Sequence, residues 1–179
     1  MRDAEMDQHI RRIANGDNEA LKTLYDALYR PIYLFALSVV KDRQLAEDAL
    51  QDTFLNVLRL ADTYRQGTKP RAWIFTVARH ASLAVLKKTA QPLLSLDEIA
   101  PTVSAPPDRE SDDAFAALEA MSVLTPVERE IVALYVYAGF RQTEIAGILH
   151  MPYGEARAHY GYAMKKLKRY YSQQGGMSP

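Results

Sequence analysis

Residues 42–62, DRQLAEDALQDTFLNVLRLAD, decide how the first half of the chain folds. The apolar residues of this stretch recur at steps of three and four, which places them on one face of an α-helix. Together with Thr53, they are Leu45, Ala46, Ala49, Leu50, Phe54, Val57, Leu58 and Ala61. The spacing predicts a helix that buries this stripe against other helices.

The opposite face of the same helix is acidic and holds one isolated apolar side chain, Leu55. Its other residues are Glu47, Asp48, Gln51, Asp52, Asn56 and Arg59. A charged outer face is most often plain solvated surface. The pattern also suits docking to a basic partner helix, because complementary charge guides the encounter and a small apolar anchor prolongs the contact. The stretch alone leaves both interpretations open.

Composition limits the classes of protein to which the chain can belong. Its 179 residues can form one ordinary domain or two small ones. It has no cysteine and four widely scattered histidines, so we expect no disulfide framework, thiolate metal site or cluster of histidines with carboxylates. A Gly-rich phosphate loop is also absent from the sequence. We therefore predict a protein without catalytic residues, a metal site or a cofactor.

Hydropathy predicts a protein that does not insert into a membrane. The longest apolar runs, near 32–40 and 131–140, are about half as long as a segment that spans a bilayer. The N-terminus is charged and lacks the apolar core of a signal peptide. A cytoplasmic location fits these features and the absence of cysteine.

The net charge of zero is the sum of three unlike segments. Residues 1–88 carry +3, residues 89–118 carry −5 and residues 119–179 carry +2, so two mildly basic blocks flank an acidic connector. The connector contains Pro92, Pro101, Pro106 and Pro107 and lacks helical periodicity. We predict a semi-rigid linker over 89–113, which joins a domain at 1–88 to a domain at 114–179.

Helices are also predicted before the opening stretch. The first is expected to stop at Asn15 and Gly16, and Asp17 or Asn18 can cap the next one, whose apolar stripe continues up to Pro31. Residues 32–40 are almost all apolar, so we expect them to form the centre of the first core.

After Asp62 no acidic residue occurs until Asp97. Residues 66–70 form a loop by composition, and residues 72–86 are predicted to form a helix. The basic and aromatic residues of this segment are Tyr64, Arg65, Lys69, Arg71, Trp73, Phe75, Arg79, His80, Lys87 and Lys88. Basic groups neutralise phosphates and aromatic faces stack on unpaired bases, so the combination suits single-stranded nucleic acid. In the alternative interpretation, Trp73 and Phe75 belong to the core and the basic residues are only solvated.

The second domain is predicted to begin with a helix over about 114–123. A second helix has a strong start signal, with Thr125 as N-cap, Pro126 at the first helical position and Glu128 completing a capping box. Gly139 is expected to end this helix. Its predicted buried side consists of Ile131, Val132, Leu134, Tyr135 and Val136.

The end of the chain has the layout of a helix-turn-helix unit. A short helix over about 142–149 is followed by a turn at His150 and Met151 and by a long helix that Pro152 opens. Such a unit can place the start of its last helix in a DNA major groove, although helical hairpins are also common in proteins that do not bind DNA. The fold class predicted for the whole chain is all-α, with two small helical domains and a proline-containing acidic linker.

Several stretches together resemble one known family. Residues 16–40 (GDNEALKTLYDALYRPIYLFALSVV), 42–60 (DRQLAEDALQDTFLNVLRL) and 71–88 (RAWIFTVARHASLAVLKK) are similar in order and spacing to the first domain of the extracytoplasmic-function sigma factors of bacterial RNA polymerase. Residues 124–171 (LTPVEREIVALYVYAGFRQTEIAGILHMPYGEARAHYGYAMKKLKRYY) resemble the second domain of that family. AEDALQDTF and RAWIFTVAR are fairly specific, and their occurrence with a downstream helix-turn-helix is much more specific than either alone.

The resemblance implies a non-enzymatic initiation subunit that binds core RNA polymerase and promoter DNA. It also suggests an anti-sigma factor as a further partner. By this resemblance, the acidic helix face docks on the clamp helices of the largest polymerase subunit. The residues implied in that contact are Asp48, Gln51, Asp52, Leu55 and Asn56.

The same resemblance assigns DNA contacts to both domains. Melted bases and phosphates of the minus-ten element would be captured by Tyr64, Arg65, Lys69, Arg71, Trp73, Arg79, His80, Lys87 and Lys88. The linker would pass near the polymerase active site and the RNA exit path. The minus-thirty-five element would be read by Tyr153, Gly154, Glu155, Arg157, Ala158, His159 and Tyr162.

The last helix departs from the pattern of the family. Members often carry a Gly-Thr-Val-Lys-Ser-Arg run, whereas this chain has GEARAHYGY over 154–162. Glu155 is repulsive near phosphates, and Gly161 weakens a helix by roughly 1 kcal/mol relative to Ala. Arg141 also stands where a small capping residue is usual. We therefore expect upstream recognition to be weak, to use an unusual element or to depend on a partner protein.

Two other functions are kept beside the sigma factor. One is a stand-alone helix-turn-helix regulator that binds duplex DNA without polymerase. The other is a sigma-like interaction protein that occupies polymerase or a regulator but does not read promoters. Pull-down with core polymerase distinguishes the first alternative from a sigma factor, and run-off transcription distinguishes the second.

Overall fold

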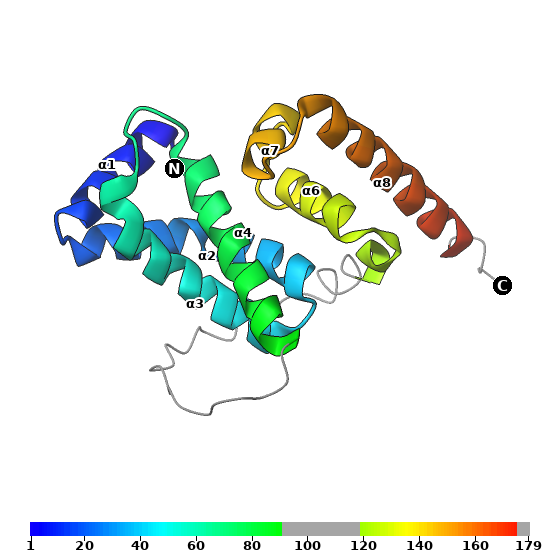
Figure 1. Ribbon diagram of the computed structural model, residues 1–179, viewed down its shortest axis with the longest axis horizontal. Coiled ribbons are helices and arrows are strands. Elements are labelled where there is room, and N and C mark those ends of the chain that lie inside the picture. Colours follow the sequence, from blue (N-terminus) through cyan, green and yellow to red (C-terminus); the bar gives the residue numbers. More distant parts are fainter. Residues whose placement is uncertain (91–118, 175–179) are drawn as a thin grey trace.

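The computed structural model describes residues 1–90 and 119–174, and every regular element in these parts is helical (Figure 1). This confirms the all-α fold class. The predicted linker, 89–113, lies outside the described residues except for its first two residues, which continue α4 (Pro70–Ala90). The predicted helix at 114–123 is described only from Glu119 onward, where it leads into the 3-10 helix η2 (Met121–Val123).

The first domain consists of α1 (Asp3–Ala14), α2 (Asn18–Val40), α3 (Arg43–Leu60), the 3-10 helix η1 (Ala61–Thr63) and α4. The carboxylate of Asp17 caps α2 by accepting hydrogen bonds from the backbone N–H groups of Glu19 and Ala20 at 3.0 and 3.2 Å. Asp42 caps α3 by accepting from the N–H of Leu45 at 2.9 Å. The predicted cap at Asp17 is confirmed, and the helix predicted over 42–62 begins directly after Asp42.

Helix α2 continues through Pro31 to Val40 without interruption. A proline inside a helix removes one backbone hydrogen bond, because it has no N–H. Leu28 and Ile32, on either side of it, are buried in the core, so packing keeps the two parts of α2 in one helix. Lys41 ends α2 in the left-handed conformation, with φ 59°.

The second domain contains η2, α6 (Pro126–Val136), α7 (Gln142–Ile148) and α8 (Tyr153–Gln174). The capping box of α6 is present as predicted. The Thr125 hydroxyl accepts from the N–H of Glu128 at 3.3 Å, and the Glu128 carboxylate accepts from the N–H of Thr125 at 2.8 Å. Gly139 and His150, with φ 68° and φ 53°, turn the chain after α6 and after α7.

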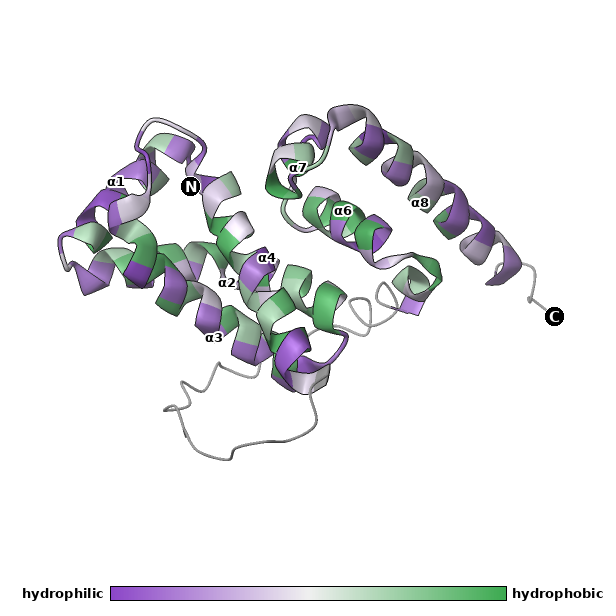
Figure 2. Cartoon of the chain, in the orientation of Figure 1, coloured by the Kyte–Doolittle hydropathy of each residue, from purple (hydrophilic) through white to green (hydrophobic). Residues whose placement is uncertain are grey.

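The two domains pack against each other. Helix α6 lies on α2 and helix α7 lies on α4, as Figure 1 shows. Buried residues of both domains form one continuous apolar cluster, which reaches from Met6 in α1 to Leu149 after α7. In Figure 2, hydrophobic residues are dense in α6 and at the end of α2 that faces it, whereas α8 is mostly hydrophilic. The core of the first domain therefore continues into the second.

Three apolar residues that we predicted to be buried are exposed, namely Leu58, Tyr135 and Val136. Leu58 lies at the edge of the predicted apolar face of α3, beyond the width that the neighbouring helices α2 and α4 cover. Tyr135 and Val136 form the last turn of α6, beyond Leu134, which is the last buried residue of that helix. Periodicity places a residue on a helix face, but neighbouring elements decide how wide and how long the buried part is.

Helix α6 also buries three charged residues, because α2 covers one side and α8 covers another. Glu128 accepts from Lys166 Nζ at 2.7 and 2.9 Å. Arg129 donates to two backbone carbonyls, and Glu130 binds a side chain of the first domain. Each buried charge thus has a partner, as its burial requires.

Candidate functional site

The outer side of α3 carries a line of acidic and apolar side chains. Asp48, Asp52, Leu55 and Leu58 follow one another at steps of four, three and three, so they lie along one side of the helix. Leu55 is 39% exposed and Leu58 is 38% exposed. We call these four residues the α3 stripe. Buried residues of α3, among them Ala46, hold the helix so that this stripe faces outward.

The polymerase-binding residues expected from the sequence all lie on or beside the α3 stripe. Asp48 and Leu55 are exposed, and Gln51, Asp52 and Asn56 are half-buried. Leu58 belongs to the same surface but was assigned to the core. Its spacing of three residues from Leu55 is the signal that identifies it as a second apolar contact.

One carboxylate of α1 holds the loop that joins η1 to α4. Asp7 accepts a hydrogen bond from the Tyr64 hydroxyl through Oδ1 and one from the Gly67 N–H through Oδ2 at 3.3 Å. The ring of Tyr64 packs against Trp73, with 5.1 Å between ring centroids, and Tyr64 is only 7% exposed. Burial, followed by the hydrogen bond to Asp7, raises the pKa of Tyr64 to about 12, so the hydroxyl remains protonated at neutral pH.

The residues expected to capture the minus-ten strand differ in exposure. Those exposed are Arg65, Lys69, His80, Lys87 and Lys88, and those half-buried are Arg71, Trp73 and Arg79. Tyr64 is buried, and its contacts with Asp7 and Trp73 hold the loop 64–69 in place. Arg65 and Lys69, on the loop itself, are the cations that this support presents to solvent.

Two half-buried cations of α4 lie against the second domain. Arg79 Nε donates to Glu130 Oε2 at 2.5 Å, and their side chains are 22% and 8% exposed. The guanidinium carbon of Arg71 lies 5.5 Å from the centre of the Phe140 ring. Glu130 and Phe140 were not identified as functional residues from the sequence, because the partners of each lie in the other domain.

The helix-turn-helix unit presents the outer face of α8 to solvent. Ala156 and Ala163 are buried on the inner face, and α8 packs on α6 and α7. The exposed members of the predicted upstream-reading set are Tyr153, Gly154, Glu155, Arg157, Ala158 and Tyr162. The seventh, His159, is half-buried, with Nε2 at 3.8 Å from Glu155 Oε1. The sequence-predicted set therefore lies together on one helix.

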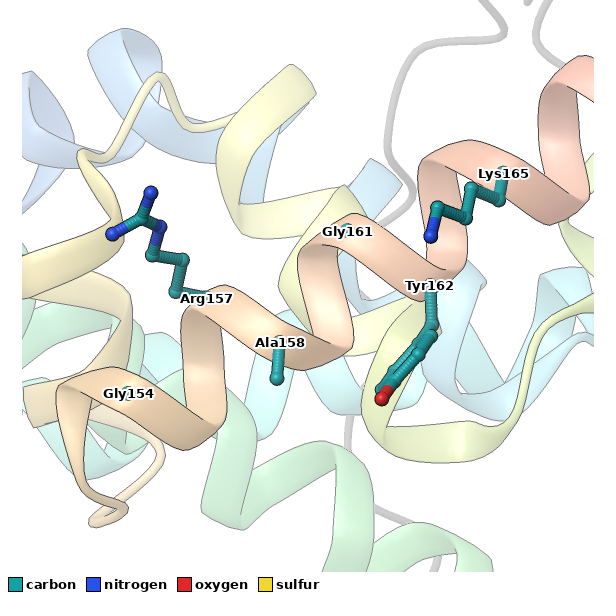
Figure 3. Close-up of a pocket in the computed structure, with 6 residues that line it drawn as sticks. All are labelled: Gly154, Arg157, Ala158, Gly161, Tyr162 and Lys165. Atoms are coloured by element: carbon teal, nitrogen blue, oxygen red, sulfur yellow. The ribbon is translucent and has the colours of Figure 1, made fainter.

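A shallow recess runs along this face of α8 (Figure 3). Its lining residues are Gly154, Arg157, Ala158, Gly161, Tyr162 and Lys165. Arg157 and Lys165 stand two turns apart, about 12 Å along the helix axis, with Ala158, Gly161 and the ring of Tyr162 between them. Lys165 was not among the residues that the sequence analysis assigned to the upstream element. Its spacing of eight residues from Arg157 is the signal that joins it to this face.

Arg141 stands at the N-cap of α7, where the family usually has a small residue. Its backbone N–H donates to the carboxylate of Glu144 at 2.9 Å. This hydrogen bond satisfies one of the donors that a helix start leaves free. Arg141 thus takes part in one half of a capping box, while its own side chain accepts no hydrogen bond from the first N–H groups of α7.

Metal sites and membrane spans are both absent from the described part of the chain. Within residues 1–90 and 119–174, no group of three or more His, Asp or Glu side chains is arranged to hold a metal ion. None of the helices in the same two ranges has the length and apolar character needed to cross a bilayer.

Comparisons with protein families give matches in both domains. Residues 24–91 match Sigma-70 region 2, and residues 114–167 match Sigma-70 region 4. The first match includes the α3 stripe, the loop 64–69 and α4, whereas α1 and Asp7 precede it. The second includes the helix-turn-helix unit and most of α8.

Curated relatives match over most of their length. The chain is 32% identical over 159 residues to the RNA polymerase sigma factor CarQ of Myxococcus xanthus, which covers 86% of this chain and 91% of CarQ. It is 25% identical over 154 residues to the ECF RNA polymerase sigma factor SigM of Bacillus subtilis, covering 84% and 94% of the two chains.

Solved structures share the fold. CnrH, in complex with the cytosolic domain of CnrY, matches with a TM-score of 0.74 and 17% identity, over 94% of this chain and 98% of CnrH. The sigma factor RpoE of Bartonella quintana, in complex with the anti-sigma factor NepR, matches with a TM-score of 0.65 and 21% identity, over 83% and 94%. Two sigma regions in the family's order favour neither a stand-alone regulator nor a sigma-like interaction protein. The chain belongs to the extracytoplasmic-function sigma factors of bacterial RNA polymerase.

Proposed function

We propose that the two domains of this RNA polymerase sigma factor divide the work of initiation. The domain at 1–88 attaches the protein to core polymerase and captures the opened strand of the minus-ten element. The domain at 114–179 sets the upstream register through α8, and the segment 89–113 links them. The exposed α3 stripe is the observation that carries this proposal, because acidic and apolar side chains stand together on a helix whose other face is fully packed.

The α3 stripe suits a basic partner surface. Asp48 and Asp52 provide charge complementarity that guides docking, and Leu55 and Leu58 provide apolar area that slows dissociation. Gln51 and Asn56, which flank the stripe, contribute polar contacts at its edge. The contact made by this stripe is with core polymerase.

The double variant Asp48→Lys/Asp52→Lys tests this assignment. Reversing both charges should abolish binding to core polymerase in a pull-down, while circular dichroism and thermal unfolding stay close to the wild type. Glu19→Lys is the charge-reversal control, because Glu19 is exposed on α2 and lies outside the proposed contact. Normal core binding by the double variant would contradict the docking assignment.

Strand capture is assigned to the loop 64–69 and to α4. Arg65, Lys69, His80, Lys87 and Lys88 are exposed and can meet phosphates directly. Trp73 supplies an aromatic face for an unpaired base. Arg71 and Arg79 join this set when they are free of the second domain, and Tyr64 supports the loop.

Upstream recognition is assigned to the recess of α8. Arg157 and Lys165 can contact phosphates or base edges on either side of Ala158 and Gly161, where the helix can approach the groove closely, and the exposed ring of Tyr162 lies beside them. Arg157→Ala should reduce promoter-dependent transcription. Unchanged activity on promoters with varied upstream sequences would contradict the role of α8 as a reader.

The proposal includes three further properties. The family consists of regulatory proteins, and we assign no catalytic residue, metal or cofactor to this chain. Its partners, core polymerase and promoter DNA, place it in the cytoplasm. CnrH and the Bartonella sigma factor were each solved with a partner chain, CnrY and the anti-sigma factor NepR respectively, and this similarity supports an anti-sigma partner for this chain as well.

A further inference from the structure

The outer face of α8 has two unlike edges. Arg157 and Tyr162 point to opposite sides of the helix, as Figure 3 shows. Glu155, His159 and Tyr162 follow one another at steps of four and three residues, so they lie along the edge away from Arg157. We call these three residues the acidic edge of α8. It combines a carboxylate, an imidazole and an aromatic ring that is 57% exposed.

The carboxylate of Glu155 is available to a ligand. Its side chain is 54% exposed, and its ion-pair partner within residues 1–90 and 119–174 is His159, with 3.8 Å between Nε2 and Oε1. Arg157 is turned toward the other edge of the helix. The side chain of His159 is less exposed, at 32%, so its ring limits the positions that the carboxylate can take. The contact restrains Glu155 and leaves its oxygens able to accept hydrogen bonds.

Glu155 also lies in the part of the helix-turn-helix unit that comes closest to bases. It belongs to the first turn of α8, and the first residues of the last helix of such a unit contact base edges in the major groove. The neighbouring residues toward the middle of the exposed face, Gly154 and Ala158, are small. The first turn can therefore approach a base pair closely enough for the Glu155 side chain to reach it.

The chemistry of a carboxylate restricts the base that it can select. An ionised carboxylate only accepts hydrogen bonds. In the major groove, cytosine presents the N4 donor, whereas guanine and the O4 of thymine present acceptors. Adenine presents its N6 donor beside the N7 acceptor. A carboxylate is therefore attracted to cytosine, meets one attractive and one repulsive group at adenine, and is repelled by guanine and by thymine.

We propose that Glu155, positioned by His159, selects a cytosine at one position of the upstream element. The inference rests on the proposed role of α8 in upstream recognition and adds the base that one of its residues reads. Arg157 and Lys165, on the same exposed face, offset the repulsion between the carboxylate and the phosphates. The unusual sequence of α8 thus changes the element that is read.

The main test uses holoenzyme assembled from the full-length protein and core polymerase. A promoter obtained by transcription of genomic DNA is randomised over its upstream element, and the DNA that the holoenzyme binds is sequenced. The wild type should enrich cytosine over adenine about tenfold at one position. Glu155→Gln should move this preference to adenine, because a glutamine amide binds N6 and N7 of adenine together. The other positions should keep their wild-type preferences.

Three further variants separate the roles within the acidic edge. Glu119→Gln is the matched control, because it removes the same charge from an exposed position of the same domain, and it should leave every base preference unchanged. Glu155→Ala should abolish the preference for cytosine without creating another. His159→Phe removes the imidazole donor and should lower the preference for cytosine several-fold, and His159→Gln, which retains a donor, should restore it.

A structural role of Glu155 gives a different result. A carboxylate in the first turn of a helix interacts favourably with the helix dipole. If this were its whole role, Glu155→Gln would lower the midpoint of thermal unfolding and would leave the base preferences unchanged. That result would overturn the proposal.

Failure of this inference is distinguishable from failure of the proposed function, because Arg157→Ala is measured on the same library. If Arg157→Ala weakens upstream recognition while Glu155→Gln retains the preference for cytosine, α8 reads the element but Glu155 does not select the base. Absence of any upstream base preference in the wild type would overturn the role of α8 as a reader, and this inference with it.

Discussion

Glu128 shows how a buried charge contributes to the second domain. Its carboxylate accepts from Lys166 Nζ and from the backbone N–H of Thr125, so it joins α8 to the start of α6. Burial alone would raise its pKa, but the bonds from Lys166 and Thr125 outweigh burial and lower the pKa of Glu128 below its usual 4.5. The folded state therefore binds the ionised form more strongly than the unfolded state does.

We predict that Glu128→Gln lowers the free energy of unfolding by about 1–2 kcal/mol at pH 7. The contribution of the carboxylate is complete above about pH 4.5 and is lost as the pH falls through the lower pKa of the folded state. Urea unfolding at pH 7 and below pH 4 measures the difference between variant and wild type. The difference should shrink in acid. Lys166→Gln should resemble Glu128→Gln, whereas the exposed neighbour Lys165→Gln should not.

A second residue-scale prediction concerns the support of the loop 64–69. Tyr64→Phe keeps the ring on Trp73 but removes the hydroxyl that donates to Asp7. The loss should cost about 1 kcal/mol of stability and should slow promoter opening several-fold, because Arg65 and Lys69 are no longer held in place. Fluorescence of a 2-aminopurine in the minus-ten element measures opening. Core binding should not change, and Tyr29→Phe should leave opening unaffected.

At the scale of elements, two glycines lie in different backbone conformations, so replacing each by alanine should change stability in opposite directions. Gly161 lies inside α8 and Gly139 lies in the turn after α6 at φ 68°, and a Cβ added at either would meet no atom within 4 Å. The backbone alone therefore decides the effect of alanine. Gly161→Ala should stabilise the protein by about 0.5–1 kcal/mol, and Gly139→Ala should destabilise it by about 1–2 kcal/mol. Thermal unfolding should show shifts of opposite sign, and equal shifts would contradict this account.

Elements whose signals are local were predictable from the sequence. Asp42 and Thr125 cap helices through neighbouring N–H groups, so three or four residues are enough to identify each start. Leu58 was placed wrongly because periodicity gives the direction of a side chain but not the width of the surface that covers it. Glu130 was missed for a related reason. Its partner, Arg79, is 51 residues away and in the other domain, which no local pattern records.

At the scale of the whole molecule, the contact between domains changes how the proposed sites relate to one another. Sequence analysis treats the α3 stripe, α4 and α8 as three independent surfaces. In the folded chain α4 is shared, because its inner residues belong to a core that extends into α6 and α7. Loss of that contact exposes apolar surface as well as Arg71 and Arg79. The two domains should therefore be coupled in stability as well as in position.

This coupling can be tested by hydrogen exchange of the free full-length protein. Phe140 packs on Phe75, so Phe140→Leu should speed amide exchange in α4 and α6 together, by about tenfold each. Leu167→Ala weakens the smaller cluster between α8 and α6 and should speed exchange in α8 while leaving α4 unchanged. Faster exchange in α6 with unchanged exchange in α4 of the Phe140→Leu protein would mean that the domains open independently. An equal increase of the exchange rate in both helices would mean that each domain is stabilised by the contact between the domains. Because this contact also covers Arg71 and Arg79, binding to core polymerase must then supply the free energy of opening.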